Sequence, residues 1–155
     1  MTNKIKKAIL INTCILVVVL GINAKTSLLI NKSESVPGKV FLLIKGKNFV
    51  KGDLVGIRNF DTAYTTSRHL TKKIAGTPGD RIIVKNDMVY INQVPQAQIK
   101  HKTKDGFPLT PIKLKVIPQN KYFVVTAHKD SFDSRYQEFG LVGEENIEGK
   151  VYLIW

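Results

Sequence analysis

The sequence contains a single cysteine, Cys14, which lies inside an apolar stretch near the N-terminus. The rest of the chain therefore cannot form an internal disulfide or use a thiol as a nucleophile. Histidine is also scarce. His69, His101 and His128 are widely spaced and form no pattern typical of a metal site or of a serine–histidine–acid triad. We expect neither a metal nor a cofactor.

Acidic residues are few, because 12 Asp and Glu stand against 24 Lys and Arg and give a formal net charge of +12. Such a charge suits nucleic acid or anionic lipid head groups. Only four of the basic residues are arginines, and no stripe of aromatic residues interleaves them for base stacking. We therefore expect no nucleic-acid partner. The lysines of residues 25–51 favour contact with a membrane surface, and an ordinary solvated surface is the alternative.

Long hydrophobic runs are absent, with one exception near the N-terminus. Residues 8–24 contain only Asn12, Thr13 and Asn23 as clearly polar members, and three lysines precede them. This length is at the lower limit for a helix that crosses roughly 30 Å of hydrocarbon, and the preceding positive charge predicts a cytoplasmic N-terminus. We predict a cytoplasmic tip and a single transmembrane helix over residues 1–25. A cleaved signal peptide and a buried core helix are the alternatives.

Residues 26–155 show strand signals and no convincing helical period. Short runs rich in apolar residues, bounded by glycine, proline or asparagine, predict strands at residues 39–45, 53–58, 81–85, 88–92, 112–117, 122–126 and 151–155. Asn86 and Asp87 tolerate the positive φ of a tight hairpin turn. The sequence predicts a mainly β domain, built as a bent sheet or partly closed barrel, with a loop insertion at residues 93–119.

Three short segments contain residue types used in nucleophilic catalysis, at residues 31–38, 72–80 and 130–135. A serine hydroxyl becomes a nucleophile when a base removes its proton, and lysine serves as that base where burial favours its neutral form. Lys72 and Lys73 lie in a strand-like run at residues 70–75. Alternation along a strand places these two lysines on opposite faces, so that one points inward while the other meets solvent.

These segments resemble those of the type I signal peptidases, serine peptidase family S26, and most closely the TraF-type conjugative-transfer peptidases. Ser35 follows the apolar segment and stands two residues before Pro37. Lys72 precedes the turn Pro78-Gly79-Asp80 by six positions. The resemblance covers nearly the whole chain. It implies that Ser35 is the nucleophile and Lys72 the general base, and that the Ser33 hydroxyl and the backbone N–H of Ser35 face the oxyanion.

The resemblance also implies a set of supporting residues. The box from Ser131 to Arg135 matches a Ser-x-Asp-Ser-Arg motif of the family. Within it, Ser131 is expected to orient Lys72, and Asp133 is expected to pair with basic groups that support the site. Lys73 is expected on the face opposite to Lys72, near Asp133. The implied fold is a compact β-rich catalytic domain of the signal-peptidase and LexA-like type over residues 26–155.

The activity implied by the resemblance is that of a serine endopeptidase at the periplasmic side of a bacterial inner membrane. It would remove the leader or tail of an exported protein, and the predicted substrate is the pilin precursor of a conjugative transfer system. A general signal peptidase for secreted preproteins and a cyclase that joins the ends of a pilin are alternatives. LexA-like self-cleaving repressors would need a DNA-binding motif where this chain has an apolar segment. The non-enzyme alternative is a membrane-tethered pilus-assembly subunit.

Overall fold

The computed structural model describes residues 7, 9–13, 21, 25–30, 36–58 and 69–155. Of the N-terminal segment, the described residues 7, 9–13, 21 and 25 are helical. No helix made of described residues is both long enough and apolar enough to cross a membrane. Most of the predicted anchor at residues 1–25 lies outside the described part of the chain, as do Cys14, Ser33 and Ser35.

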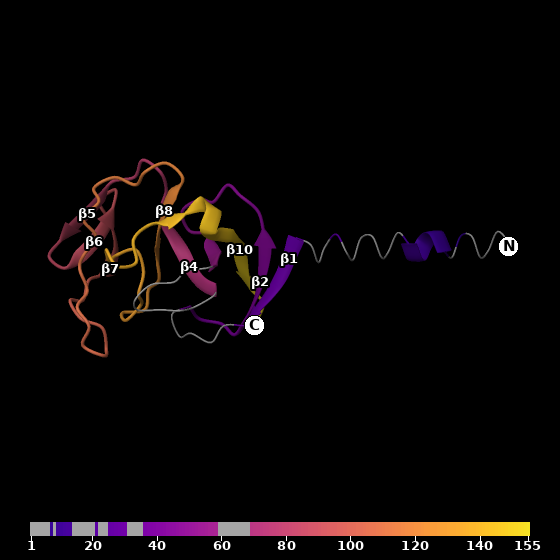
Figure 1. Ribbon diagram of the computed structural model, residues 1–155, viewed down its shortest axis with the longest axis horizontal. Helices are drawn as coiled ribbons and strands as arrows, with labels where there is room; N and C mark the ends of the chain where they lie inside the picture. The colour runs from indigo at the N-terminus through magenta and orange to yellow at the C-terminus, as the bar shows by residue number, and fades with distance from the viewer. Residues whose placement is uncertain (1–6, 8, 14–20, 22–24, 31–35, 59–68) are drawn as a thin grey trace.

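The larger of two sheets has seven antiparallel strands in the order β1-β2-β10-β3-β4-β8-β9. These are β1 (Thr26–Ile30), β2 (Val40–Lys45), β3 (Leu54–Arg58), β4 (His69–Gly76), β8 (Lys121–Val125), β9 (Val142–Gly143) and β10 (Ile147–Leu153). The strand β10 from the end of the chain inserts between β2 and β3. Figure 1 therefore shows the C-terminus close to β1 and β2. The mainly β prediction is confirmed.

The smaller sheet has the strand order β5-β6-β7 and lies at the end of the domain opposite to β1 and β2 (Figure 1). Its strands are β5 (Ile82–Lys85), β6 (Met88–Ile91) and β7 (Val94–Gln98). The predicted turn at Asn86 and Asp87 is confirmed, because both residues have positive φ, at 49° and 54°. A second two-residue turn joins β6 to β7, with positive φ at Asn92 and Gln93.

The strand predicted at residues 112–117 is wrong. This segment lies beside the start of β5, with an isolated bridge between Arg81 and Val116 and a hydrogen bond of 2.8 Å from the Ile82 N–H to the Lys115 carbonyl, and it forms no continuous ladder. Pro111 and Pro118 bound it on both sides, and proline has no N–H to donate to a neighbouring strand. The alternating apolar and polar residues therefore belong to an irregular segment, which lies along the smaller sheet.

The loop insertion predicted at residues 93–119 also needs correction. Its first part is β7, which pairs with β6 in antiparallel register. Further along, Ile99, Leu109, Ile112 and Ile117 are buried in a core cluster together with residues of β4 and β8. The segment therefore helps to build the core between the two sheets.

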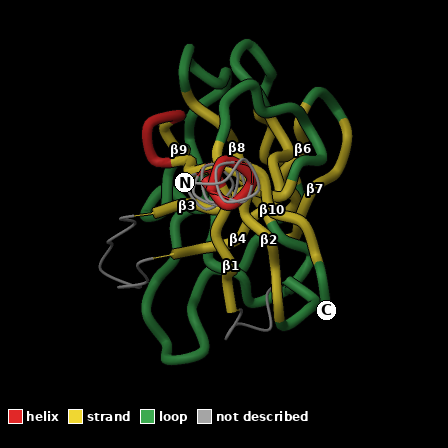
Figure 2. The backbone as a smooth tube through the Cα atoms, turned by 90° about the vertical axis from the view of Figure 1, so that its right-hand side faces the viewer, coloured by secondary structure: helices red, strands yellow, loops and turns green. Residues whose placement is uncertain are grey.

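The two faces of β4 and β8 belong to different core clusters, as the period of two along a strand requires. Ala75 and Val125 pack toward the smaller sheet. Ile74 and Val124 pack on the opposite face, in a cluster that extends to β9 and β10. The short 3₁₀ helix η1 (Glu144–Asn146) lies beside β9 (Figure 2). A buried polar side chain on either strand is thus surrounded by the core.

Candidate active site

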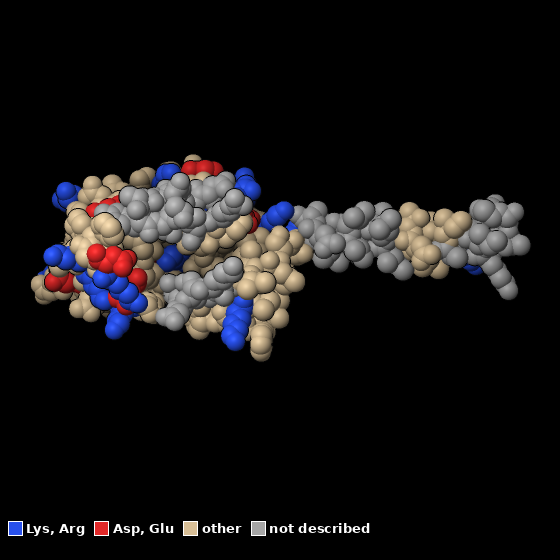
Figure 3. Space-filling view, turned by 60° about the horizontal axis from the view of Figure 1, so that its bottom comes forward, with Lys and Arg blue, Asp and Glu red and all other residues tan. Residues whose placement is uncertain are grey.

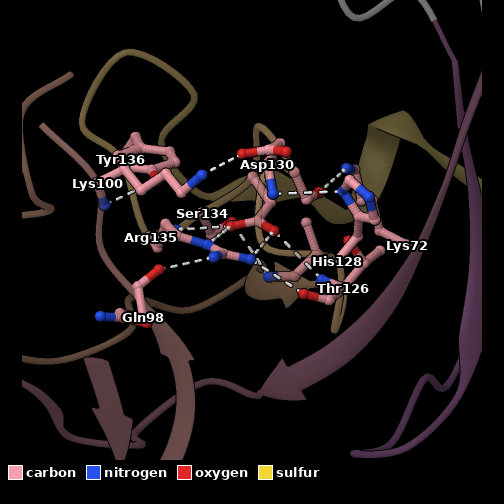
Figure 4. Close-up of polar contacts among 12 residues, drawn as sticks. Lys72, Gln98, Lys100, Thr126, His128, Asp130, Ser134, Arg135 and Tyr136 are labelled. Carbon is pink, nitrogen blue, oxygen red and sulfur yellow. Dashed lines mark hydrogen bonds and ion pairs between the residues drawn. The ribbon is translucent and has the colours of Figure 1, made fainter. Parts of the chain in front are cut away.

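Lys72 is a buried lysine in the middle of β4, and its side chain meets the loop that follows β8 (Figure 4). Only 4% of the residue is exposed, whereas its neighbour Lys73 is exposed on the other face of the strand. Lys72 Nζ donates a hydrogen bond of 2.7 Å to Ser131 Oγ. The structure thus brings together two of the predicted site residues that are 59 positions apart in the chain.

The environment of Lys72 favours a neutral amine. Burial lowers the pKa of Lys72 from its ordinary value of 10.5 to about 8. The Asp133 carboxylate acts against this shift, and the Arg135 guanidinium reinforces it. The Phe139 ring lies with its centroid 5.9 Å from Lys72 Nζ. A lysine with this pKa has an appreciable neutral fraction near neutral pH, and the neutral amine can accept a proton.

Asp133 and Arg135 form a fully buried ion pair, and Figure 4 shows Arg135 on the left of the site and Lys72 on the right. Arg135 Nε donates to Asp133 Oδ1 at 2.7 Å, and Nη2 donates to Oδ2 at 2.8 Å. The remaining donors reach backbone carbonyls, that of Gln98 at 2.8 Å and that of Thr126 at 3.0 Å. Because every charged group has close partners, the desolvation cost of the buried pair is offset by a bidentate contact that fixes its geometry.

The loop that contains this pair is tied to β8. Ser134 exchanges two hydrogen bonds with the backbone of Val124, since its N–H donates to the Val124 carbonyl and its hydroxyl accepts from the Val124 N–H. The Ser131 N–H donates to the His128 carbonyl at 3.1 Å. Asp130, next to Ser131, forms an ion pair with Lys100. These contacts fix the position of the Ser131 hydroxyl relative to β4.

The predicted nucleophile Ser35 and the predicted oxyanion residue Ser33 lie outside the described residues, but the segment directly after them is well anchored. Val36 is buried in a cluster with residues of β2 and β10. Gly38 has φ +116°, and a Cβ atom there would lie 2.2 Å from a methyl carbon of Leu153. The N–H groups of Lys39 and Val40 both donate to the carbonyl of the last residue. The positive φ and the close contact with Leu153 mean that only glycine fits at position 38.

The placement of Lys73 differs from our expectation. The ion-pair partner of Asp133 among the described residues is Arg135, and Lys73 is exposed rather than next to this carboxylate. The hydrogen bond that the Gln98 carbonyl accepts from Arg135 could not be predicted from the sequence, because every residue type has a backbone carbonyl. Phe139 could have been found as an aromatic residue shortly after the Ser-x-Asp-Ser-Arg box. In the described part of the chain, no group of His, Cys, Asp and Glu side chains could hold a metal ion.

Comparison with known proteins shows which sequences this chain is similar to. A family model described as signal peptidase, peptidase S26, matches residues 2–155. Signal peptidase IB of Staphylococcus aureus is 36% identical over 101 residues, which cover 54% of this chain and 52% of the relative. Signal peptidase I S of Bacillus subtilis is 37% identical over 113 residues, which cover 65% of this chain and 56% of the relative. The chain spans about half the length of the curated relatives that it matches.

A solved structure is also similar to this chain. It is a signal peptidase I from Enterococcus faecalis, with a TM-score of 0.46 and 23% sequence identity. The similarity covers 67% of this chain and 97% of that chain.

Proposed function

The chain belongs to the signal peptidase family, peptidase S26, and on this premise we propose that it is a serine endopeptidase with Ser35 as nucleophile and Lys72 as general base. The observation that carries this proposal is the buried Lys72, whose pKa is lowered to about 8 and whose Nζ is held by Ser131. An exposed lysine would stay protonated at neutral pH and could not accept the proton of a serine hydroxyl.

The proposed reaction is acyl transfer through an ester intermediate. Ser35 Oγ attacks the carbonyl carbon of the scissile bond while its proton passes to Lys72 Nζ. The Ser33 hydroxyl and the Ser35 N–H donate to the developing oxyanion, and one such donor is typically worth about 3–4 kcal/mol. Lys72 then gives its proton to the leaving amine. Water attacks the acyl-enzyme, Lys72 takes its proton, and the serine hydroxyl is regenerated. Ser131 orients the lysine throughout.

The proposed place of action is a membrane surface on the outer side of a bacterial inner membrane, with residues 1–25 as the single anchor. One face of β1, β2 and β10 is rich in exposed apolar side chains, and it supports this location. Leu28 lies opposite Leu42, and Leu42 lies opposite Tyr152, in one row across the three strands. In the next row Ile30 lies opposite Val40. Leu28 is 68% exposed and Ile30 is 77% exposed. We call this surface the outer apolar face.

The charge of the protein fits the same location. Lysine and arginine side chains are spread over the face shown in Figure 3, whereas acidic side chains gather at a few places. Trp155, 75% exposed, ends the chain next to the outer apolar face, and Lys39 Nζ lies 5.3 Å from its ring centroid. Tryptophan and lysine together are typical of the interface between lipid and water. Anionic head groups would attract the excess positive charge.

The proposed substrate is an exported protein, and two classes are in question. The two-residue spacing of Ser35 and Pro37 is similar to the TraF-type branch and favours the pilin precursor of a conjugative transfer system. The names of the relatives from Staphylococcus and Bacillus favour a general signal peptidase for secreted preproteins. A pilin substrate would further allow its own N-terminal amine to replace water and close a ring.

The test is cleavage by the full chain in proteoliposomes, given a propilin and a secreted preprotein in separate reactions. Ser35→Ala should abolish cleavage of the true substrate, and the control Ser27→Ala in β1 should not. Normal processing by a folded Ser35→Ala protein would exclude the proposed nucleophile. The intact mass of the product distinguishes the outcomes, because a cyclic product is lighter than the linear one by one water molecule. Cleavage of the preprotein alone would exclude the pilin role.

A further inference from the structure

Thr126, the residue directly after β8, has an unsatisfied hydroxyl in the core. The residue is 5% exposed, and its Oγ1 is the one buried side-chain nitrogen or oxygen atom in the described part of the chain without a hydrogen-bond partner. A buried hydroxyl without a partner destabilises a fold, and valine would fill the same volume without that cost. The presence of a hydroxyl at this position is therefore not explained by its effect on the stability of the fold.

The backbone of Thr126 is fixed, so the residue cannot shift to find a partner. Its N–H donates to Asp133 Oδ2 at 3.2 Å. Its carbonyl accepts from Arg135 Nη2 at 3.0 Å. Asp133 and Arg135 are themselves fully buried and paired with each other. The buried ion pair thus fixes the backbone from which the Thr126 hydroxyl projects into the core.

The strand register puts that place beside Lys72. In the β4–β8 pair, Lys73 lies opposite Val125 and Ile74 lies opposite Val124. One step further along the same register, Lys72 comes opposite Thr126. Residues directly opposite in an antiparallel pair project to the same face, with Cβ atoms about 4.5–5.5 Å apart. Figure 4 agrees, since it shows Thr126 between Arg135 and Lys72.

Lys72 in its charged form needs more acceptors than the resting structure records. An ammonium group has three donors. Ser131 Oγ accepts one of them, and no second hydrogen bond from Lys72 Nζ is recorded among the described residues. The charged groups that act on Lys72 are Asp133 and Arg135, and Asp133 is already engaged by Arg135 and by the Thr126 N–H. His128 lies on the same loop as Ser131, and its Nδ1 accepts a hydrogen bond of 3.3 Å from the Asp130 N–H.

We propose that the Thr126 hydroxyl is a second hydrogen-bond acceptor for the Lys72 ammonium and hence a positioning residue for the general base. This inference rests on the proposed Ser35–Lys72 chemistry. When Ser35 gives its proton to Lys72, a rotation of the lysine end group directs one N–H to Ser131 Oγ and a second to Thr126 Oγ1. The third N–H is then left to protonate the leaving amine. The partner of Thr126 is therefore the Lys72 ammonium, which forms whenever Lys72 carries a proton, including during the reaction.

The experiment compares Thr126→Val, which removes the hydroxyl and keeps the shape, with Thr126→Ser, which keeps the hydroxyl. The first readout is the ionisation of Lys72 in the full chain without substrate, followed by NMR of ¹³Cε-labelled lysine. A hydrogen bond to the charged form favours that form. Thr126→Val should therefore shift the ionisation constant about three- to tenfold toward the neutral amine. Thr126→Ser should restore the wild-type titration.

The second readout is the pH profile of substrate cleavage in proteoliposomes. For Thr126→Val the rise in rate should move to lower pH, and kcat on the plateau should fall several-fold while KM stays unchanged. The control is Thr103→Val, since the Thr103 hydroxyl accepts a hydrogen bond of 3.1 Å from the Phe107 N–H far from the site in sequence. This control should lose some stability without a change in the Lys72 titration. Thr126→Val should gain stability, because it loses an unsatisfied polar group.

The results separate this inference from the proposed function. A Lys72 titration that is identical in Thr126→Val and in the wild type overturns the inference, even if stability changes. A changed KM with an unchanged titration also overturns it, because Thr126 would then contact the substrate rather than the lysine. A wild-type chain that cleaves no substrate refutes the proposed function and leaves the titration result to stand. If Thr126→Val does not fold, Thr126→Ala takes its place in both readouts.

Discussion

Two parts of the larger sheet depart from the usual distribution of side chains in opposite directions. Where β4 meets β8, the core contains Lys72, Asp133 and Arg135, three charged residue types that proteins seldom bury. Where β1, β2 and β10 lie side by side, the outer apolar face exposes Leu28, Ile30 and their neighbours to solvent. The first region contains charge in an apolar setting, and the second presents apolar side chains to water.

The burial of Lys72 and the exposure of the outer apolar face both destabilise the isolated domain, so neither is explained by folding. A buried ionisable group with a shifted pKa is typical of a reaction site. A contiguous exposed apolar surface is typical of contact with another apolar surface. The difference between the two regions supports the proposed chemistry at the first and the proposed membrane contact at the second, and mutations should separate the two.

The largest effect on cleavage should distinguish the two adjacent lysines when each is replaced by methionine in turn. Lys72→Met should reduce substrate cleavage by about three orders of magnitude or more, because a catalytic pair loses nearly all of its effect when one member is removed. Lys73→Met, on the exposed face of β4, should retain turnover. Cleavage rates of both variants in proteoliposomes check this. An inactive Lys73→Met with an active Lys72→Met would reverse the assignment of the base.

The next largest effect should be the loss of the buried ion pair. Asp133→Asn leaves the Arg135 charge in the core without its partner, which typically costs about 3–5 kcal/mol. Urea unfolding measures the change. Lys51→Met is the matched control, because it removes a surface ion pair with Asp80 that is worth roughly 0–1 kcal/mol. If both variants lose the same small amount, the buried pair does not support the site as described.

The burial of Lys72 should also appear in the pH dependence of stability. Between pH 8 and 10.5 the unfolded chain binds a proton that the folded chain does not, so stability rises with pH across this window and is constant below it. The difference between 10.5 and about 8 corresponds to roughly 3 kcal/mol. Lys72→Met lacks this dependence. Its advantage in the free energy of unfolding over wild type should be about 3 kcal/mol larger at pH 6.5 than above pH 10.5.

An equal difference between Lys72→Met and wild type at the two pH values would show that Lys72 keeps its ordinary pKa. Lys73→Met is the control, because this exposed neighbour should give the same small difference at both pH values.

The smallest effect should come from the outer apolar face. Trp155 is the only tryptophan of the chain, so quenching of its fluorescence by brominated lipids reports contact with the bilayer. A Leu28→Asn/Ile30→Asn double variant should lose part of this quenching, since each side chain contributes at most about 1.5–3 kcal/mol when fully buried. Val94→Asn is the control, because Val94 is an exposed apolar residue of β7, at the other end of the domain (Figure 1). Unchanged quenching in the double variant would remove the outer apolar face from the proposed membrane contact.

Local patterns were sufficient for much of the fold. Runs of apolar residues between turn residues located β2, β3, β5, β6 and β8 and the last three residues of β10, because strand formation and turns depend on neighbouring residues in the chain. The same kind of pattern misled at residues 112–117, where alternation occurs without a partner strand. The short strand β7 was missed inside a segment rich in proline and lysine. Alternation reports which side chains share a face and does not report whether another strand is available to pair.

The sequence by itself determined that Lys72 and Lys73 point to opposite faces, because the side-chain period of a strand is two. The strand period alone did not determine which of these two lysines is buried. The six-residue spacing between Lys72 and Pro78 favoured Lys72 only through the resemblance to the signal peptidase family. Only the tertiary structure decided the rest: Ser131 contacts Lys72, Arg135 rather than Lys73 pairs with Asp133, and Thr126 follows the Lys73–Val125 pair by one step of the β4–β8 register. The first and the third join parts of the chain that are distant in sequence, whereas Asp133 and Arg135 are two positions apart and are brought together by the burial of their loop in the core. The pKa of Lys72 depends on the tertiary structure too, since burial by the surrounding core is its main cause.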